Sequence, residues 1–81
     1  MTGQEAIDAL LRERAPGQTI CPSEAARLLA KARSDEDWRG YMDEVHGCVD
    51  RMLASRRVML SWKGIPMAAR DGPYRIARPR R

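Results

Sequence analysis

The first stretch of the chain alternates apolar and polar residues with the period of a helix. Three apolar side chains between residues 4 and 14 fall at i, i+3 and i+4 and so share one face: Ile7, Leu10 and Leu11. Thr2 and Glu5 stand three residues apart, which is the spacing of a capping box at a helix start. A proline–glycine pair at 16–17 ends the pattern, because proline cannot continue a helix and glycine turns readily. We predict a helix over residues 4–14.

A second helical pattern follows a short β-prone pair at residues 19–20. Pro22 suits the first position of a helix, where a backbone N–H would have no partner in any case. Glu24 then lies in the first turn, where the helix dipole favours an acid. We predict a short strand at 19–20 and a helix over 22–32, with Ala25, Leu28 and Leu29 inward and Arg27 and Lys31 outward.

The third helical pattern is the longest, and it follows a polar cluster. Ser34 precedes three acids at 35–37, a hydroxyl followed by carboxylates, which is typical of a helix start. Six apolar residues keep helical spacing after it: Trp38, Met42, Val45, Val49, Met52 and Leu53. Two glycines inside the pattern each cost about 1 kcal/mol relative to alanine. We predict a helix that starts at Ser34 and runs as far as Ser55.

Residues 57–62 have the two-residue period of a β-strand. Val58, Leu60 and Trp62 alternate onto one face. Because that face carries two aliphatic side chains, we expect Trp62 to pack into the core together with Trp38.

Turn residues divide the rest of the chain. Lys63-Gly64 predicts a turn, and residues 65–69 form either a second strand or a loop. A strand there must lie at a sheet edge, because Pro66 has no N–H to donate to a neighbouring strand. A further turn at 71–73 leads into a final short strand at 74–76.

The predicted order is helix, short strand, helix, helix and β-hairpin, which is that of a winged helix-turn-helix. We therefore predict an α+β fold with three helices and a small antiparallel β-hairpin wing. Residues 19–20 are expected to complete the sheet of that wing as a further strand. A chain of 81 residues suits one domain and is too short for two. We assign residues 1–77 to that domain and residues 78–81 to a basic C-terminal tail.

Composition narrows the class of protein. With 43% hydrophobic and 32% charged residues, the chain is too apolar to be disordered and too charged for a membrane protein. No apolar run approaches the ~20 residues that span a bilayer. The first residues also lack the basic and apolar segments of a secretory signal. We expect a cytoplasmic protein, in which Cys21 and Cys48 remain free thiols.

The charges are unevenly distributed. The chain has a net charge of +4, but residues 34–50 carry six acids and one arginine, while residues 51–81 carry nine basic residues and one acid. Such asymmetry indicates that the C-terminal third either faces an anionic partner or folds back on the acidic segment.

Groups for catalysis or metal binding are few. His46 and Cys48 stand two residues apart on a predicted helix, so their side chains diverge. Zinc requires three or four ligands, and Cys21 is the one other obvious candidate. A Cys–His nucleophilic pair would lack an orienting third group, and no glycine-rich phosphate loop is present. We expect neither an enzyme, a metal site nor a cofactor; a small hydrolase or transferase would need a pocket around Cys21 or His46.

Nucleic acid is the leading predicted partner. Seven residues are our candidate contacts, the first three on the outer face of the third helix and the others on the wing: Arg39, His46, Arg51, Arg56, Arg57, Lys63 and Arg75. The same helix carries Asp43, Glu44 and Asp50, which would repel a phosphate backbone. The alternative is a protein-interaction module in which these acids or a methionine-rich surface dock a partner. A continuous positive surface beside the third helix would favour nucleic acid, and interleaved acids would favour protein.

Several short segments are similar to a small bacterial family known only as a domain of unknown function. They are residues 19–24 (TICPSE), Trp38-Arg39 with Met42 and Val45, Lys63-Gly64, and residues 72–75 (GPYR). The resemblance covers nearly the whole chain and implies a winged-helix fold without implying an activity. The chain departs from that family at Arg56-Arg57, where a glycine commonly precedes the strand. It also has Tyr41 and His46 where leucine and arginine are more usual, and the last change removes a positive charge from the third helix.

Overall fold

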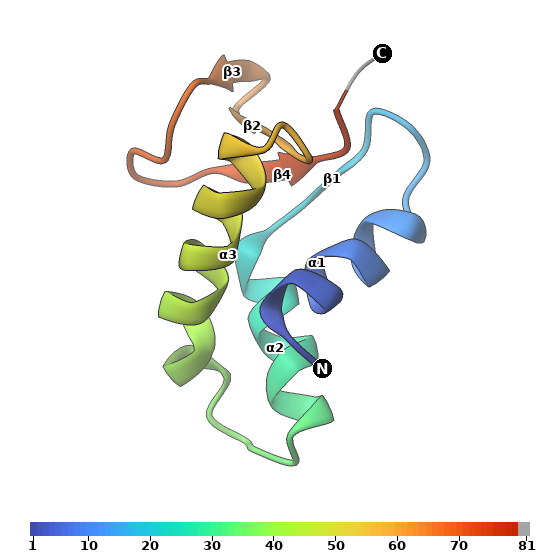
Figure 1. Cartoon of the computed structure of the whole chain (residues 1–81), viewed down its shortest axis with the longest axis vertical. Coiled ribbons are helices and arrows are strands. Elements are labelled where there is room, and N and C mark those ends of the chain that lie inside the picture. Colours follow the sequence, from blue (N-terminus) through green and yellow to red (C-terminus); the bar gives the residue numbers. More distant parts are fainter. Residues whose placement is uncertain (80–81) are drawn as a thin grey trace.

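A computed structural model describes residues 1–79. Helices form one layer of this part of the chain, and a four-stranded antiparallel sheet lies across one end of it (Figure 1). The elements in chain order are α1 (Gly3–Arg12), β1 (Thr19–Ile20), α2 (Pro22–Ala32), the 3₁₀ helix η1 (Trp38–Tyr41), α3 (Met42–Ala54), β2 (Met59–Trp62), β3 (Ile65–Met67) and β4 (Arg75–Ala77). This confirms the predicted α+β class with three α-helices, and the arrangement is compatible with a winged-helix-like fold. Arg80 and Arg81 of the predicted tail lie outside the described residues.

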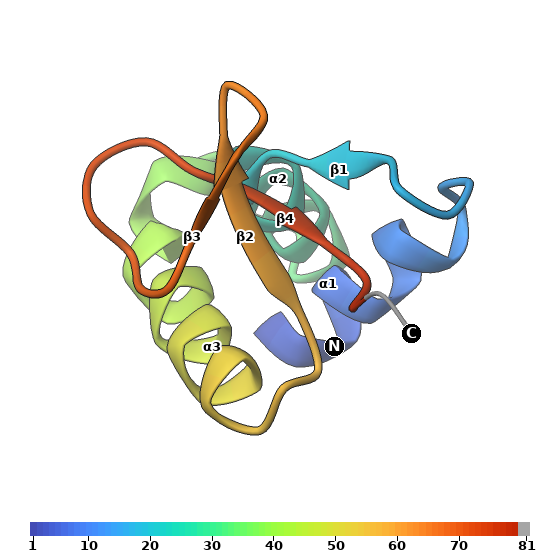
Figure 2. The ribbon, with the colours of Figure 1, turned by 90° about the horizontal axis from the view of Figure 1, so that it is seen from above.

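The sheet has the strand order β1-β4-β2-β3, and every neighbouring pair is antiparallel (Figure 2). Its inner face is apolar, since Ile20, Leu60 and Ile76 are each at most 2% exposed. They join the buried residues of the three helices in one core. Thr19, Ser61 and Arg75 alternate onto the outer face, which the helices do not cover. The β-prone pair at 19–20 therefore completes the sheet, as predicted.

The start of α1 follows the predicted capping box. The Thr2 hydroxyl accepts the Glu5 N–H at 3.1 Å, and the Glu5 carboxylate accepts the Thr2 N–H at 2.8 Å. Gly3 begins the helix where it meets α3: a Cβ at that position would lie 2.7 Å from the Cys48 sulfur. The helix ends at Arg12, two residues earlier than predicted. The second helix has the predicted bounds.

The prediction that Ser34 begins the third helix is wrong. Ser34 has a φ of +55° and follows the last turn of α2. Its N–H donates to the Lys31 carbonyl at 3.1 Å, and the Asp35 N–H donates to the Ala30 carbonyl at 2.9 Å. This pair of bonds is a Schellman motif, which ends a helix. The third helix begins at Met42, after η1.

The acids after Ser34 do not cap α3; Asp35 instead accepts hydrogen bonds within the segment between α2 and α3. The Asp35 carboxylate accepts the Asp37 N–H at 2.9 Å and the Tyr41 hydroxyl at 2.8 Å. These bonds lower the pKa of Asp35. A small polar residue followed by acids therefore suits the end of one helix as well as the start of the next, and local composition does not separate the two.

β3 lies at the edge of the sheet, as Pro66 requires. Lys63 and Gly64 have φ values of +51° and +80°, as in a type I′ turn, so the adjacent pair Trp62 and Ile65 share the first hydrogen bonds of the hairpin. In the next pair, Ser61 and Pro66, the backbone groups of each residue point away from the other strand. The edge of β3 would expose an N–H at this position, and Pro66 has none.

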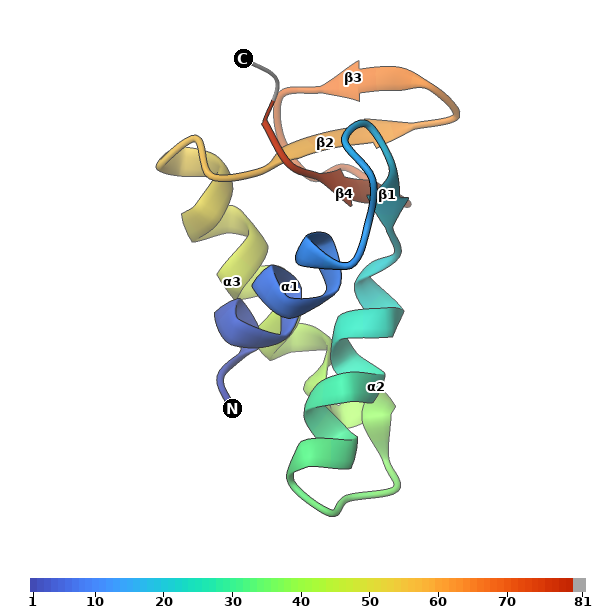
Figure 3. The same ribbon diagram turned by 90° about the vertical axis from the view of Figure 1, so that its right-hand side faces the viewer.

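The prediction that Trp62 packs into the core is wrong, although the predicted alternation is right. Val58 and Leu60 are both 2% exposed, whereas Trp62 is 39% exposed. β2 continues past the helices into the hairpin, whose tip projects from the body (Figure 3). Trp62 lies next to the turn and pairs with Ile65, which is 68% exposed. Trp38 is partly buried and packs against the core.

Candidate nucleic-acid interface

The seven predicted contact residues come from separate parts of the fold. Arg39 lies in η1, ahead of α3 and not on its outer face as predicted. His46 and Arg51 lie on α3, and Arg56 and Arg57 follow its end. Lys63 is at the hairpin tip and Arg75 is in β4.

Arg39 stacks on an aromatic ring. Its guanidinium carbon lies 4.4 Å from the centroid of Trp38, and that of Arg27 from α2 lies 4.5 Å from the same ring. Planar guanidinium groups stack well on indole. Arg27 therefore helps to hold η1 against α2, while Arg39 stacks on its own neighbour within η1, far from the hairpin in sequence.

His46 joins α3 to the residue before β4. Its Nδ1 lies 2.6 Å from the hydroxyl of Tyr74, which is 4% exposed. Burial, with Arg70 nearby, lowers the pKa of His46, and burial raises the pKa of Tyr74 to about 12. His46 Nδ1 and the Tyr74 hydroxyl share one hydrogen bond, whose direction follows the tautomer of the imidazole. This bond joins α3 to the residue before β4.

Two of the three acids on α3 are paired with arginines from other elements. Glu44 accepts both Nη atoms of Arg33 at 2.9 and 3.0 Å. Asp50 accepts Nε and Nη2 of Arg70 at 2.7 and 2.8 Å. Each arginine lowers the pKa of its partner carboxyl. Asp43 is exposed on the same helix.

The outer side of α3 is therefore a mixed surface. Arg51 is exposed there and donates weakly to the Cys48 sulfur at 3.3 Å. It stands beside exposed Asp50 in sequence, and an exposed acid, Asp43, lies two turns earlier. This helix does not offer a continuous positive face to phosphate.

The side chain of Arg75 ties β4 to β1. Its Nε donates to the Thr19 hydroxyl at 2.8 Å, and its Nη2 donates to the Thr19 carbonyl at 3.4 Å. The side chain is partly buried and lies on the outer face of the sheet. Its charge remains on that face, and two of its three nitrogens donate to Thr19.

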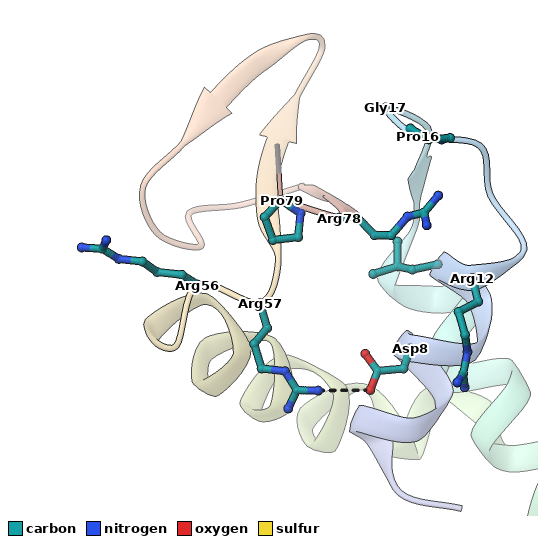
Figure 4. A pocket seen from close by; sticks show the side chains of 9 residues that line it. Asp8, Arg12, Pro16, Gly17, Arg56, Arg57, Arg78 and Pro79 are labelled. Atoms are coloured by element: carbon teal, nitrogen blue, oxygen red, sulfur yellow. Dashed lines mark ion pairs between the residues drawn. The ribbon is translucent and has the colours of Figure 1, made fainter. Parts of the chain in front are cut away.

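A basic hollow lies between the C-terminal half of α1, the turn after α3 and the residues after β4 (Figure 4). We call it the α1 hollow; its volume is about 1170 Å³, and its lining is Asp8, Leu11, Arg12, Pro16, Gly17, Arg56, Arg57, Arg78 and Pro79. Four arginines thus surround one carboxylate. Arg57 Nη2 lies 3.5 Å from Asp8 Oδ2, while Arg56 extends away from the hollow.

A second hollow of about 620 Å³ lies on the outer face of the sheet. We call it the sheet hollow, and its lining is Gly17, Thr19, Met59, Leu60, Ser61, Lys63, Gly64, Pro66, Arg75, Ala77 and Arg78. It contains three basic residues and no acid. Gly17 and Arg78 line both hollows, so the two adjoin each other there.

Together these hollows form what we call the sheet-side basic surface, which is defined by Arg12, Arg56, Arg57, Lys63, Arg75 and Arg78. Four of its members were predicted contacts. Arg12 and Arg78 were missing from that set: Arg12 lies far from the predicted wing in sequence, and Arg78, which directly follows the last strand, was assigned to the C-terminal tail. Within residues 1–79, Arg12, Arg56 and Lys63 form no ion pair.

Two residues of this surface have a strained backbone. Arg56 has a φ of +61° and occupies the position after the C-cap of α3, where its N–H donates to Leu53 and the next N–H donates to Met52. Lys63 has a φ of +51° in the hairpin turn. Glycine or asparagine fits such positions better than arginine or lysine. The backbone conformation at positions 56 and 63 therefore does not explain why each position carries a cationic residue.

Metal ligands, thiols and long apolar helices are the other features that could form a site in the part of the chain that the structure describes. No three His, Cys, Asp or Glu residues gather there in a way that would hold a metal ion. Cys21, at the start of α2, and Cys48, buried in α3, are free thiols. None of the described helices combines the length and apolar character needed to cross a bilayer.

Comparison with known proteins identifies a family. The model of the family described as "Protein of unknown function (DUF3253)" matches residues 2–79, and the chain belongs to this family. No curated protein matches the chain.

Proposed function

We propose that this member of DUF3253 is a non-catalytic nucleic-acid-binding domain that holds phosphates on its sheet-side basic surface. The observation that carries the proposal is the gathering of six cationic residues around two adjoining hollows whose lining contains one carboxylate, Asp8. This arrangement of charge is complementary to a phosphate backbone, because the backbone presents a regular row of anions.

The free cations on this surface are suited to phosphate. Arg12, Arg56 and Lys63 are exposed and, among the described residues, have no carboxylate partner. Binding a polyanion therefore replaces their counterions without breaking an ion pair. Three such contacts predict a slope of about −3 in a plot of log affinity against log salt concentration.

The surface implies little reading of base sequence. Phosphate contacts position a protein on nucleic acid and carry no direct sequence information. In a helix-turn-helix protein, α3 is the element that would read base edges. Here α3 carries the acids Asp43 and Asp50, which repel phosphate. We therefore assign the main contacts to the sheet-side basic surface and not to α3.

The test is binding to a labelled 20-base-pair duplex over a series of salt concentrations. Two variants remove a cation while relieving backbone strain: R56G and K63N. Because both substitutions suit the local φ, weaker binding would not reflect weaker folding. K31Q is the matched control, since Lys31 is an exposed cation on α2, outside both hollows.

We expect the double variant R56G/K63N to lose about tenfold in affinity at 50 mM salt and to lower the salt slope by about two. K31Q should change affinity less than about twofold. Equal losses in the two proteins would contradict contact through the proposed surface. No binding of the unaltered protein at low salt would contradict nucleic-acid binding altogether.

A protein-interaction module is the second candidate. It is favoured by the carboxylates that lie among the arginines, as in the pairs Asp8–Arg57 and Asp50–Arg70. Such mixed surfaces suit a partner with complementary charges of both signs. Absence of nucleic-acid binding would support this candidate.

A further inference from the structure

The tip of the β2–β3 hairpin carries exposed apolar side chains beside a cation. Of four large apolar residues that are well exposed among the described residues, three lie on this hairpin: Met59, Trp62 and Ile65. Trp62 and Ile65 are paired across the strands next to the turn. Lys63 Nζ lies 6.0 Å from the centre of the Trp62 ring. Packing within the fold therefore does not explain why a tryptophan stands at position 62.

The backbone that carries Trp62 at the hairpin tip is well ordered by its turn and its strand pairing. A type I′ turn matches the twist of the two strands and fixes their register. Two residues further from the tip, Leu60 is buried in the core and Met67 packs against the core. Trp62 is therefore held by a rigid hairpin and not by a mobile loop.

Addition of a strand from a partner does not explain the exposed tip. The outer edge of the hairpin is β3, and the register places the backbone position of Pro66 toward that edge. Proline cannot donate the hydrogen bond that an added strand would require there. The tip must therefore be used through its side chains.

The surroundings of the tip select an anionic partner with flat apolar groups. Lys63 also lines the sheet hollow, together with Arg75 and Arg78. The alternation along β2 places Trp62 on the opposite face from that hollow, so a nucleic-acid strand whose phosphates lie in the hollow meets the indole by passing over Lys63 at the tip. Its bases are then the nearest apolar groups that can contact the indole. Stacking of a base on an aromatic side chain needs no particular sequence, because every base has a π-face.

We propose that Trp62 is a stacking contact for unpaired nucleobases, so that the domain prefers nucleic acid with unpaired bases over a continuous duplex. This inference rests on the proposed function and names its substrate class. In a continuous duplex the bases are stacked and paired, and presenting one to Trp62 requires unstacking it. In a single strand, or at a gap, that cost is small or absent.

The experiment compares a labelled 20-nucleotide single strand, a duplex with a four-nucleotide gap and a continuous duplex, measured by fluorescence anisotropy at one salt concentration. The proteins are the unaltered chain, W62A, W62F, W62L and R56G. Trp62 is exposed, so W62A should melt at the same temperature as the unaltered chain. W62F keeps a ring, and W62L keeps apolar area without one.

We expect the unaltered chain to bind the single strand and the gapped duplex at least fivefold more tightly than the continuous duplex. W62A should lose most of that preference while changing affinity for the continuous duplex less than about twofold. W62F should restore most of it and W62L little. A single strand containing 5-iodouridine should form a photochemical cross-link to Trp62.

The outcomes separate this inference from the proposed function. If R56G weakens binding to all three nucleic acids while W62A changes none of the affinities, the stacking contact is overturned and phosphate binding stands. Full rescue by W62L would overturn stacking in favour of a general apolar contact. Absence of binding to every nucleic acid would overturn both. Binding of phosphatidylserine vesicles that depends on Trp62, without any preference for unpaired bases, would assign the tip to a membrane surface.

Discussion

The outer side of α3 and the sheet-side basic surface differ in how their charges are used. Both regions are rich in ionic side chains. On α3, Glu44 and Asp50 each hold an arginine in two hydrogen bonds. On the sheet side, Arg12, Arg56 and Lys63 form no ion pair within residues 1–79. The position of opposite charges in space, and not their number along the chain, decides which region attracts an anion.

Reversal of charge should separate the two regions most strongly. The double variant R56E/K63E places two acids on the sheet-side basic surface, and we expect about a hundredfold loss of duplex affinity at 50 mM salt. R51E makes the same type of change on α3 and should cost less than about threefold. Titrations by fluorescence anisotropy measure both. A comparable loss for R51E would show that α3 also faces the nucleic acid and would remove the distinction.

Loss of the Tyr74 hydroxyl should affect folding and spare binding. Y74F leaves His46 Nδ1 without its partner in a partly buried position, so we expect a loss of about 1 kcal/mol in the free energy of unfolding. In a chain of this size that lowers the melting temperature by about 4–8 °C. Y41F is the control, because its hydroxyl bonds to Asp35 in an exposed position, and it should cost less.

Calorimetry measures both melting temperatures, and the duplex titration measures binding. Y74F should bind with unchanged affinity. A large loss of affinity with no loss of stability would place the His46–Tyr74 pair in the interface itself.

Breaking an ion pair on α3 should have a small effect on stability. The side chains of Arg70 and Asp50 are 33% and 51% exposed, and an ion pair this exposed contributes little to the free energy of unfolding. D50N should therefore lower the midpoint of urea denaturation only slightly. It also releases Arg70, and we expect affinity for the duplex to rise about two- to threefold. A tenfold rise would mean that paired acids had masked a nucleic-acid surface on α3.

The smallest effect should be on stability between pH 7.5 and 5.5. The pKa of His46 in the folded chain lies below its ordinary value of 6.5, because burial and Arg70 disfavour the imidazolium. The unfolded chain therefore takes up a proton first as the pH falls, so the contribution of His46 is complete above pH 6.5 and is lost below it. The midpoint of urea denaturation should be lower at pH 5.5 than at pH 7.5.

H46Q should remove this difference. The paired carboxyls of Glu44 and Asp50 have lowered pKa values, so their protonation belongs to a more acidic range and does not contribute to it. If the urea midpoint of H46Q still differed by the same amount between pH 7.5 and 5.5, the pH dependence would belong to another group.

Local signals in the sequence predicted much of the fold. The capping box at Thr2 and Glu5, the proline at the start of α2 and the Lys63-Gly64 turn each depend on residues within a few positions. Ser34 misled the prediction, because a small polar residue before acids is equally compatible with a helix end. For Trp62, alternation predicted the correct face of the strand, but it contains no information on how far the core extends.

The candidate site was predicted less well, because its geometry depends on distant residues. Arg75 bonds to Thr19, which is 56 positions away, and Arg78 bonds to the carbonyl of Arg14, which is 64 positions away. His46 is held by Tyr74 from the other end of the chain. No periodicity in the sequence reports such pairs. Charge counts identified an arginine-rich third of the chain without identifying which arginines are free.

The proline in β3 has a consequence for copies of this chain that are crowded together. A polyanion gathers basic proteins side by side, and unprotected sheet edges at such closeness template growth from one molecule to the next. One edge of this sheet is the two-residue β1, and the other carries Pro66. Under the proposed function, many copies can therefore occupy one nucleic-acid strand without joining their sheets, and each can dissociate separately.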